Sequence, residues 1–313
     1  MSTSLGIDIG GTNIKAAVVH ADGRVAAFET SAWSGGAAAD AFETIERLAA
    51  AVGDASGVPL DTCGCGCAGL VDHETGIVRS SPNLPQWHDV RLAEELARRL
   101  RIPVLVENDA NAAAYGEYSA GAARGATNAV MVTIGTGIGG GIVLDGSIYR
   151  GSHGFAAEIG HSVIDLSGGV RCACGSTGCV EPLVNAASLV VQAKQRMEEG
   201  EESVLAERAA PLTARAVGEA AAAGDPLARR VTDDIGRTLG VLLANIVAYL
   251  DPDVIVIGGG VAAAGSSLMD AANAEFAERT AKYQGMATRI VMAELGDTAG
   301  VVGAALLAGS SRP

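Results

Sequence analysis

A unit of strand, glycine-rich turn and two further strands is repeated in this chain, and it restricts the fold more than any other feature. The first copy centres on the turn Gly10-Gly11-Thr12 and the second on Gly135-Thr136-Gly137. Apolar runs that alternate with such turns are typical of strands joined by tight hairpins. Because the copies share little beyond their glycines, we interpret them as a duplication of architecture, which predicts two similar halves.

The other segments predict helices and strands that alternate around these copies. Helical patterns cover residues 40–52, 89–100, 109–120, 182–198, 213–223, 226–250, 271–282 and 299–310. Asp89 is expected to cap the second of these helices. We therefore predict an α/β fold with an N-terminal domain at residues 1–121 and a C-terminal domain at residues 122–298. The last helix, at residues 299–310, is expected to pack back on the first domain.

The composition agrees with this organisation and excludes several classes of protein. The chain has 313 residues, of which 42 are Gly, and only 4% are aromatic, as expected for an α/β protein with many tight turns. Its formal net charge of −14 would repel a nucleic acid. The N-terminus lacks the pattern of a signal peptide, and no apolar run is long enough to span a membrane. We expect no nucleic-acid partner, no membrane partner and a cytoplasmic location, where the cysteines stay reduced or bind metal.

Three cysteines and a histidine lie close together in the second half. The four residues, His161, Cys172, Cys174 and Cys179, are a typical donor set for one tetrahedral zinc ion. The alternatives are free thiols, which would oxidise when clustered and exposed, and a disulfide, which suits a secreted protein. Glu158 and Glu181 flank the loop, and carboxylates accept hydrogen bonds from hydroxyl groups. The sequence therefore predicts a zinc-stapled loop at residues 161–181 that presents acidic groups to a polyhydroxylated ligand.

Both glycine turns suit the phosphates of a nucleotide. The backbone N–H groups of Gly10, Gly11, Thr12, Gly135, Thr136 and Gly137 can close on phosphate oxygens, although neither turn matches a Walker A or Rossmann pattern. Asp8 comes just before the first turn, where a carboxylate would hold Mg²⁺ directly or through water. Lys15 could contact a phosphate or be a solvated strand residue. Gly259 and Gly260 alone would indicate a turn into a helix, but they would also let an adenine ring lie against the backbone.

Asp109 lies where a predicted strand ends and a helix begins. Ligands of α/β proteins bind at this end of a strand. Asp109 could simply cap the helix. In a protein with two phosphate turns, however, a carboxylate here also suits phosphoryl transfer, which needs a group that accepts the proton of the attacking hydroxyl. We interpret Asp109 as the general base.

Together these motifs resemble the ROK family of sugar kinases, above all bacterial glucokinases, along almost the whole chain. The resemblance rests on Gly6-Ile-Asp8-Ile-Gly10-Gly11-Thr12, Glu107-Asn108-Asp109-Ala-Asn111-Ala, Gly135-Thr136-Gly137-Ile-Gly139-Gly140-Gly141, Glu158-Ile-Gly160-His161 and Cys172-Ala-Cys174-Gly175-x-x-Gly178-Cys179-Val-Glu181. It implies the actin/hexokinase-like fold, in which two RNase-H-like domains surround a central cleft.

The resemblance also implies a role for each motif. The reaction would be the ATP- and Mg²⁺-dependent phosphorylation of a hexose at its 6-hydroxyl, with glucose as the expected substrate and Asp109 as base. The sugar hydroxyls would be held by Asn83, Asn108, Asp109, Glu158, His161 and Glu181. Zinc would be structural and would have no open position. His161 would bind zinc through one ring nitrogen and donate to the sugar through the other.

Three features depart from the family pattern or stay undecided. Cys63, Cys65 and Cys67 replace the usual Ile or Val on one face of a strand, and we expect them to be buried rather than bound to a second metal. Ala157 stands where many relatives have Gly. Trp87 suits either a wall of the sugar pocket or the hydrophobic core.

Other functions stay open from the sequence. The same acidic groups would also bind N-acetylmannosamine, N-acetylglucosamine, fructose or mannose, and polyphosphate could replace ATP. Sugar-sensing ROK repressors carry an N-terminal helix-turn-helix, for which we expect no room before residue 5. A zinc-ribbon nucleic-acid module would explain neither the glycine turns nor Asp109. The resemblance further suggests a homodimer or homotetramer.

Overall fold

The computed structural model describes residues 3–208, 210–260, 266–283, 285 and 287–310. Two compact units share the chain. Unit 1 comprises Met1–Met131, Gly141–Ala157 and Ala293–Pro313, and unit 2 comprises Val132–Gly140 and Glu158–Met292. Each unit therefore needs segments that are distant in the sequence. The predicted mixed α/β fold is confirmed.

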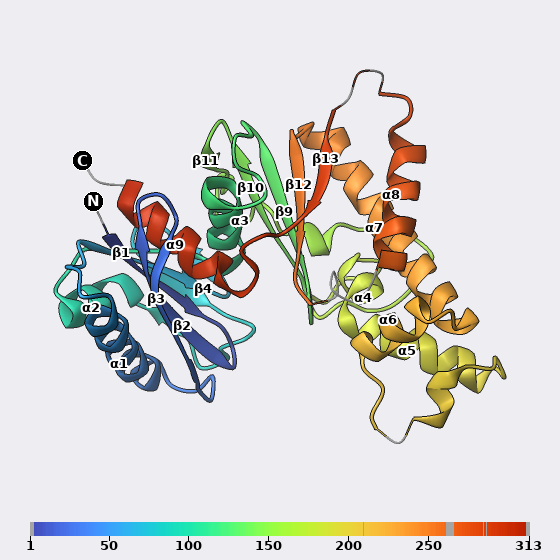
Figure 1. Ribbon diagram of the computed structural model, residues 1–313, viewed down its shortest axis with the longest axis horizontal. Coiled ribbons are helices and arrows are strands. Elements are labelled where there is room, and N and C mark those ends of the chain that lie inside the picture. Colours follow the sequence, from blue (N-terminus) through green and yellow to red (C-terminus); the bar gives the residue numbers. More distant parts are fainter. Residues whose placement is uncertain (1–2, 209, 261–265, 284, 286, 311–313) are drawn as a thin grey trace. The chain divides into compact units, whose positions relative to one another are not determined.

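The main sheet of unit 1 is five-stranded and has the order β3-β2-β1-β4-β8 (Figure 1). Its strands are β1 (Thr3–Ile9), β2 (Asn13–His20), β3 (Val25–Ala32), β4 (Thr62–Cys67) and β8 (Val104–Asn108). The first three pair antiparallel, as the predicted hairpins require, and β4 and β8 continue the sheet parallel to β1. Ile9, Cys67 and Asn108 are in register. Asp8 and Asp109 consequently lie at the same edge of this sheet.

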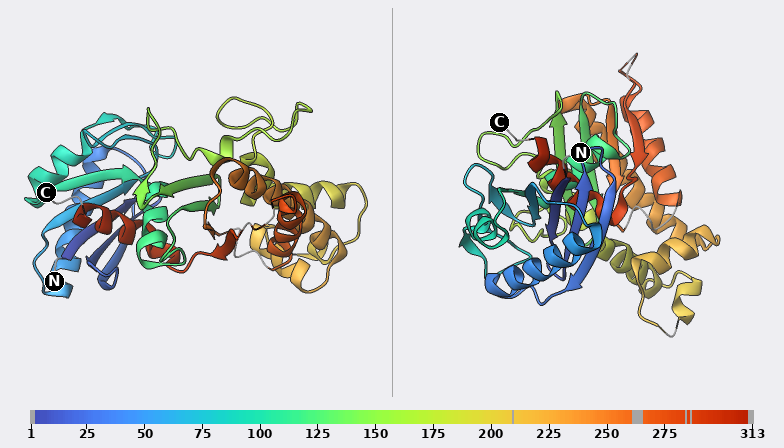
Figure 2. Two further views of the ribbon diagram at one scale, coloured as in Figure 1. Left: turned by 90° about the horizontal axis from the view of Figure 1, so that it is seen from above. Right: turned by 60° about the vertical axis from the view of Figure 1, so that its left-hand side comes forward.

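Helices cover both faces of the sheet of unit 1. The face with Leu5, Ile7 and Ile9 packs against α1 (Ala38–Ser56) and α2 (Leu92–Leu100) to form the main core of this unit. The other face packs against α9 (Ala299–Ser310), which also contacts α3 (Asp109–Ala120). The C-terminal helix thus lies along strands from the start of the chain (Figure 2).

Glycines let α9 lie directly on the sheet. A Cβ atom at Gly6 would be 1.9 Å from the carbonyl oxygen of Val301, and one at Gly64 would be 1.8 Å from that of Ala304. No side chain larger than hydrogen can therefore occupy these positions without moving the helix.

The three unusual cysteines of β4 point to the opposite face. Cys63, Cys65 and Cys67 are fully buried in the core under α1 and α2, and burial raises the pKa of the Cys63 thiol to about 12. In the described part of the chain, no group of metal-binding side chains includes them. The expectation that they are small core residues is confirmed.

A second five-stranded sheet has the order β11-β10-β9-β12-β13. Its strands are β9 (Ala129–Ile134), β10 (Ile138–Leu144), β11 (Ser147–Ile148), β12 (Val254–Gly258) and β13 (Arg289–Met292). Each of β9 and β10 has residues in both units. A three-stranded sheet in unit 1 is formed by β5 (Leu70–Asp72), β6 (Ile77–Ser80) and β7 (His88–Val90).

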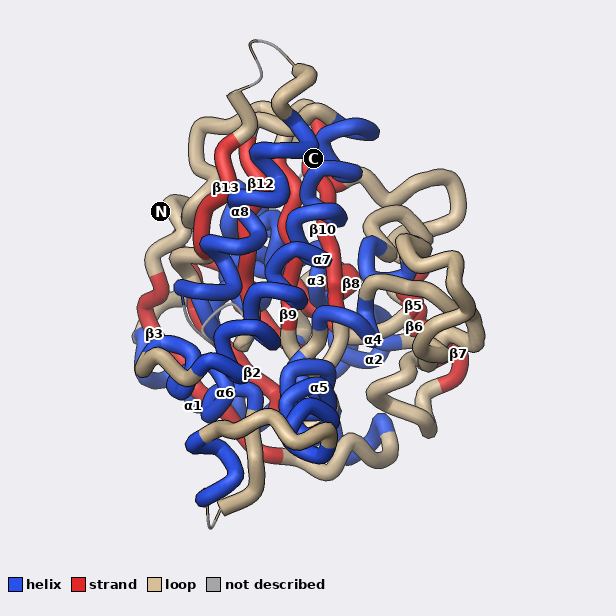
Figure 3. The backbone as a smooth tube through the Cα atoms, turned by 90° about the vertical axis from the view of Figure 1, so that its right-hand side faces the viewer, coloured by secondary structure: helices blue, strands red, loops and turns tan. Residues whose placement is uncertain are grey.

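The helices of unit 2 are α4 (Glu181–Val184), α5 (Ala186–Glu198), α6 (Ala214–Ala222), α7 (Pro226–Leu250) and α8 (Ser266–Thr280). The longest, α7, starts after the capping residue Asp225 and packs along α8 (Figure 3). Among the described residues, no helix has both the length and the apolar character that crossing a membrane requires.

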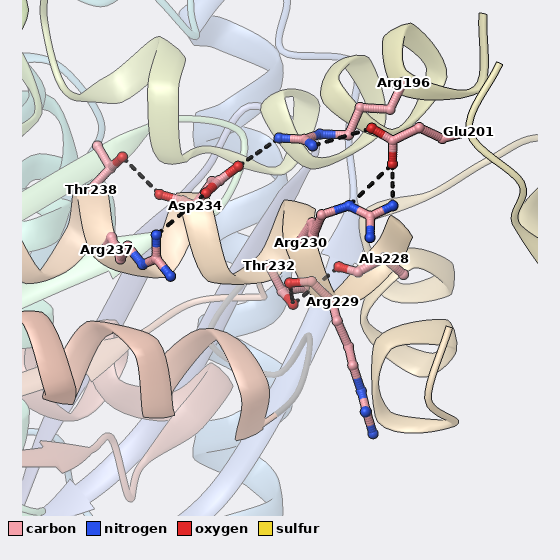
Figure 4. A network of polar contacts seen from close by, with 9 residues as sticks. All are labelled: Arg196, Glu201, Ala228, Arg229, Arg230, Thr232, Asp234, Arg237 and Thr238. Atoms are coloured by element: carbon pink, nitrogen blue, oxygen red, sulfur yellow. Dashed lines mark hydrogen bonds and ion pairs between the residues drawn. The ribbon is translucent and has the colours of Figure 1, made fainter. Parts of the chain in front are cut away.

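A network of charged side chains joins α5 to α7. Figure 4 shows Arg196 of α5 between Glu201 and Asp234. Its distance to the Asp234 carboxylate is 2.6 Å, and Glu201 in turn accepts from Nε of Arg230 at 3.1 Å. Because these side chains are partly exposed, each pair contributes at most about 1 kcal/mol.

Four sequence predictions need correction. Asp89 does not cap α2, which begins at Leu92; instead it lies in β7 and pairs with Arg79. The helix predicted at residues 182–198 breaks at Asn185, whose side chain caps α5. The short strands β5 and β7 were missed. The whole glycine-rich run of residues 135–141 was expected to break the chain between two strands, but Gly139–Gly141 belong to β10, and a Cβ at Gly141 would be 2.4 Å from Cβ of Ala114 in α3.

Candidate active site and metal centre

Four side chains of unit 2 converge as potential metal ligands. The ligand atoms of His161, Cys172, Cys174 and Cys179 all lie within 4.8 Å of one another. Cys174 Sγ is 3.8 Å from Cys179 Sγ, and Cys172 Sγ is 3.5 Å from His161 Nδ1. The usual zinc bond lengths in a tetrahedron place two sulfurs about 3.8 Å apart, and a sulfur and a nitrogen about 3.5 Å apart. The donor atoms and their spacing therefore fit zinc.

The local backbone brings these ligands together. His161 ends a short 3-10 helix, Ile159–His161. Isolated bridges then join Val163 to Cys179 and Arg171 to Thr177, which folds the loop back on itself. Gly178 has a φ of 78°, and a Cβ there would be 1.9 Å from the carbonyl oxygen of Asp165. Only glycine suits the position just before Cys179.

The environments of the three thiols differ. Burial raises the pKa of Cys172 to about 11 and also raises that of Cys179. The pKa of Cys174 is lowered, mainly because the backbone N–H of Ser176 donates to it. Metal ligation requires all three as thiolates, so a cation would have to supply the charge that opposes burial.

Both flanking glutamates lie beside the cluster. Glu158 Oε2 is 3.8 Å from His161 Nε2, so the ring turns Nδ1 to the cysteines and Nε2 to this carboxylate. Glu181 begins α4, and its Oε2 accepts the N–H of Ile138 at 3.0 Å while Oε1 is 3.7 Å from Cys172 Sγ. Glu181 thus contacts both the cluster and the chain just after the second glycine turn.

The helix that carries Asp109 is capped by its neighbour. Asn108 Oδ1 accepts the N–H groups of Ala110 and Asn111 at 3.0 and 3.1 Å, and its Nδ2 donates to the carbonyl oxygen of Gly69. Asp109 is the first residue of α3, and its Oδ1 accepts the N–H of Ala110 at 2.9 Å. The alternative that Asp109 serves only as the cap is therefore wrong. Asn108 keeps one further amide hydrogen with which it could bind a ligand.

An ion pair between buried Glu107 and half-buried Arg150, behind Asp109, was not found from the sequence. Glu107 is 2% exposed, and its Oε2 accepts from Nε and Nη2 of Arg150 at 2.8 and 2.6 Å. A charged residue at the end of an apolar strand was the available signal, because a buried carboxylate needs a partner. The partner itself lies 43 residues away, beyond the reach of local patterns.

The first glycine turn lies at the sheet edge next to Asp8. Gly10 N donates to the carbonyl oxygen of Asn13, and Trp33 Nε1 donates to that of Gly10 at 2.8 Å. Burial raises the pKa of Asp8, and Lys15, whose Nζ is 3.7 Å from Asp8 Oδ2, opposes this. Lys15 also donates to the carbonyl oxygen of Asp297, so it is not merely a solvated strand residue. A single carboxylate is enough for Mg²⁺ that keeps waters and binds phosphates.

Asn83 and Trp87 have separate places near this turn. A Cβ at Gly11 would be 3.4 Å from the carbonyl oxygen of Asn83, so Asn83 borders the turn. Trp87 is fully buried, packs edge to face on Trp33 at 6.2 Å between ring centroids, and donates to Gly36. Trp87 is therefore a core residue and not a wall of a sugar pocket.

The second glycine turn lies next to Gly259, one of the two glycines predicted to border adenine, within unit 2. Gly135 N donates to the carbonyl oxygen of Gly137, and Thr136 is exposed. Gly259 has a φ of 89°, and a Cβ there would be 2.4 Å from the carbonyl oxygen of Ile134, just before the turn. Nothing lies within 4 Å of a Cβ at Gly260. The residues predicted for phosphate and for adenine are thus neighbours.

Known proteins resemble this chain over most or nearly all of its length. The model of the ROK family matches residues 4–311. A glucokinase of Halalkalibacterium halodurans is 37% identical over 96% of this chain and 92% of its own. A ROK family glucokinase of Streptomyces griseus, solved in complex with glucose and AMPPNP, is 34% identical, covers 99% of this chain and 100% of its own, and has a TM-score of 0.83. A xylose repressor of Caldicellulosiruptor bescii is 29% identical over 77% of this chain and 60% of its own.

The family match and the motifs agree with each other. The segments that carry the Cys/His cluster, Asp109 and both glycine turns all lie inside the matched residues. This chain belongs to the ROK family.

Proposed function

We propose that this protein transfers the γ-phosphoryl group of ATP to the 6-hydroxyl of a hexose, with glucose as the substrate. The observation that carries the proposal is the structural similarity to a ROK glucokinase solved with glucose and AMPPNP, which covers 99% of this chain. The H. halodurans glucokinase supports the same class of reaction.

Asp109 acts as the general base in this proposal. Its carboxylate accepts the proton of the 6-hydroxyl while that oxygen attacks the γ-phosphorus, and the bond from phosphorus to the β-phosphate oxygen breaks. Its position at the carboxyl end of β8, with the helix cap supplied by Asn108, supports this role. The other sugar hydroxyls bind Asn83, Asn108, Glu158, His161 and Glu181.

The nucleotide binds to backbone groups. In unit 1 these are Gly10, Gly11 and Thr12, and in unit 2 they are Gly135, Thr136 and Gly137, which donate to phosphate oxygens. Gly259 and Gly260 lie against the adenine. Asp8 would hold Mg²⁺ directly or through water, and the ion would supply positive charge to the phosphates.

In this proposal the Cys/His site orients a residue that binds the sugar and takes no part in the chemical step. His161, Cys172, Cys174 and Cys179, whose ligand atoms lie within 4.8 Å of one another, would fill the four positions of a zinc ion. Bonding of Nδ1 to zinc would fix the tautomer of His161, so that Nε2 would carry the hydrogen and could donate it. Glu158, 3.8 Å from Nε2, then binds the same region of the sugar.

The proposal is tested by ADP release with Mg-ATP across hexoses and N-acetylhexosamines, with a control that lacks sugar. Wild-type protein should turn over glucose. Asp109→Asn should lower kcat about 10²- to 10⁴-fold, as expected when a general base is removed. Asp54→Asn, an exposed aspartate of α1, is the matched control and should not change kcat.

Three outcomes have separate meanings. Turnover of another sugar alone would keep the mechanism and replace glucose as substrate. Turnover with polyphosphate but not with ATP, assayed in parallel, would keep the sugar and replace ATP as the phosphoryl donor. No turnover of any sugar by folded, zinc-loaded protein would refute the kinase proposal.

A sugar-sensing repressor is the second candidate, and the similarity to the C. bescii xylose repressor favours it. That relative is matched over only 60% of its own length. The net charge of −14 opposes DNA binding. Retention of duplex DNA by the protein at low salt, altered by a sugar, together with absence of turnover, would support the repressor.

A further inference from the structure

We propose that the ion pair between buried Glu107 and half-buried Arg150 positions the catalytic base. It holds the first turn of α3, which carries Asp109, against the segment of unit 1 that continues along the chain into Glu158. This inference rests on the proposed function, because it gives Asp109 and Glu158 the roles stated there. Both paired residues belong to unit 1.

The Glu107 carboxylate is surrounded by donors from both sides. Its Oε1 accepts the backbone N–H of Asn108 at 3.0 Å and Nδ2 of Asn111 at 3.1 Å. Its Oε2 accepts from Nε of Arg150 at 2.8 Å and from Nη2 at 2.6 Å. One carboxylate therefore contacts the residues on either side of Asp109, namely Asn108 and Asn111, and the guanidinium of Arg150.

Arg150 is fixed in its own segment. Its Nη1 donates to the carbonyl oxygen of Ile148 at 3.5 Å, and its carbonyl oxygen accepts the N–H of Ala156 at 3.2 Å. The second contact closes the loop of residues 150–156, and Glu158 follows two residues later. The guanidinium thus connects the start of α3 to the segment from which a predicted sugar ligand extends.

The chemistry of the pair favours positioning over stability. An ion pair that buries a carboxylate usually stabilises a protein no more than apolar side chains of the same volume would, because the buried charge loses its water. It does, however, restrict geometry, since Nε and Nη2 are held in one planar group that lysine lacks. A shift of about 1 Å at a reacting group can lower a rate about 10²-fold. Fixing the position of Asp109 should therefore affect the reaction rate more than the free energy of unfolding.

The test compares Arg150→Met, Arg150→Lys and Glu107→Gln with wild type by steady-state kinetics, at a temperature where each variant is folded. Arg79→Met, which breaks an exposed arginine–carboxylate contact in the same unit, is the matched control. Arg150→Met should lower kcat about 10- to 100-fold and raise the KM for the sugar, while the KM for ATP stays within about twofold. Arg150→Lys, which keeps the charge but not the planar group, should fall between Met and wild type.

Chemical rescue supplies a second measurement. Guanidinium ion at millimolar concentration should restore part of kcat to Arg150→Ala, because the Arg150 side chain is 24% exposed and its site can be reached from solvent. Urea, of similar shape but neutral, should not.

Unchanged kinetics in Arg150→Met and Glu107→Gln would overturn the positioning role. So would a fall in kcat that matches the unfolded fraction of the variant and leaves the KM for sugar and the KM for ATP unchanged. If wild-type protein turns over sugar in that same assay, the proposed function survives this result. Absence of wild-type turnover would instead refute the proposed function, and the positioning role with it.

Discussion

At Ala157 the backbone adopts the left-handed conformation, with a φ of 69°. This conformation costs an L-residue about 1–2 kcal/mol, whereas glycine adopts it freely. Glycine in turn loses about 0.5–1 kcal/mol of backbone entropy on folding. Ala157→Gly should therefore raise the free energy of unfolding by up to about 1 kcal/mol, measured by urea denaturation.

The control for this prediction is the same exchange where the backbone is helical. Ala51→Gly, at an exposed position in the interior of α1, should lower the free energy of unfolding by about 1 kcal/mol. An equal loss at both positions would mean that Ala157 is not strained.

At the scale of an element, α7 depends on the residue that caps its N-terminus. Asp225 is 7% exposed and accepts the N–H of Ala228 at 2.8 Å and that of Val204 at 2.9 Å. Burial alone would raise the pKa of Asp225, but these backbone donors outweigh it and lower the pKa below 3.8. The carboxylate therefore joins the start of α7 to the 3-10 turn at Val204–Glu207.

Asp225→Ala should lower the free energy of unfolding by about 2 kcal/mol near neutral pH, because a helix cap is lost and buried N–H groups are left without an acceptor. Since the pKa is lower in the folded state, this stabilisation is complete above the unfolded value near pH 4 and is lost as the pH falls through the folded value. The difference between wild type and variant should thus shrink in urea titrations below pH 4. Asp225→Asn, which keeps one acceptor, should lose less; a difference that stays constant with pH would contradict the role of the charge.

Local signals explain which elements could be predicted from the sequence. The helices at Asp109–Ala120 and Pro226–Leu250 have the predicted bounds, because Gly121 ends the first and Asp225-Pro226 begins the second. The strands β5 and β7 have three residues each, too few to show a period. Gly139–Gly141 resemble a loop in sequence, and only the contact of Gly141 with α3 explains glycine in a strand.

In the candidate site, too, some features could be predicted from local sequence signals and others could not. The four predicted metal ligands lie within 19 residues in the sequence, so their spacing alone predicted that they would meet. Which of Asn108 and Asp109 caps α3 depends on side-chain geometry that adjacent residues of similar type do not reveal. The Glu107–Arg150 pair required knowledge of which distant segment covers the end of β8.

At the scale of the whole molecule, the chain passes between its two units at several points, and the last segment returns to unit 1. The buried carboxylate of Glu117 in α3 holds this return, because it accepts the N–H of Glu294 at 3.1 Å and that of Leu295 at 2.8 Å. Beyond it, α9 places Val301, Val302 and Ala305 on the sheet. Unit 1 should therefore be unable to complete its core until the end of the chain is available.

A chain that ends at residue 298 tests this dependence, and one that ends at residue 310 keeps α9 as the control. Removal of α9 exposes the sheet face with Gly6 and Gly64 and takes away buried apolar side chains, in a protein whose net stability is expected to be only about 5–15 kcal/mol. The two tryptophans of the sequence, Trp33 and Trp87, both belong to unit 1, so their fluorescence reports on this unit alone. In the shorter chain their emission should shift to the wavelength of solvent-exposed tryptophan and show no cooperative change in urea. Emission like that of the control, with a cooperative transition, would mean that unit 1 folds without α9 and that the C-terminal helix only covers a sheet already formed.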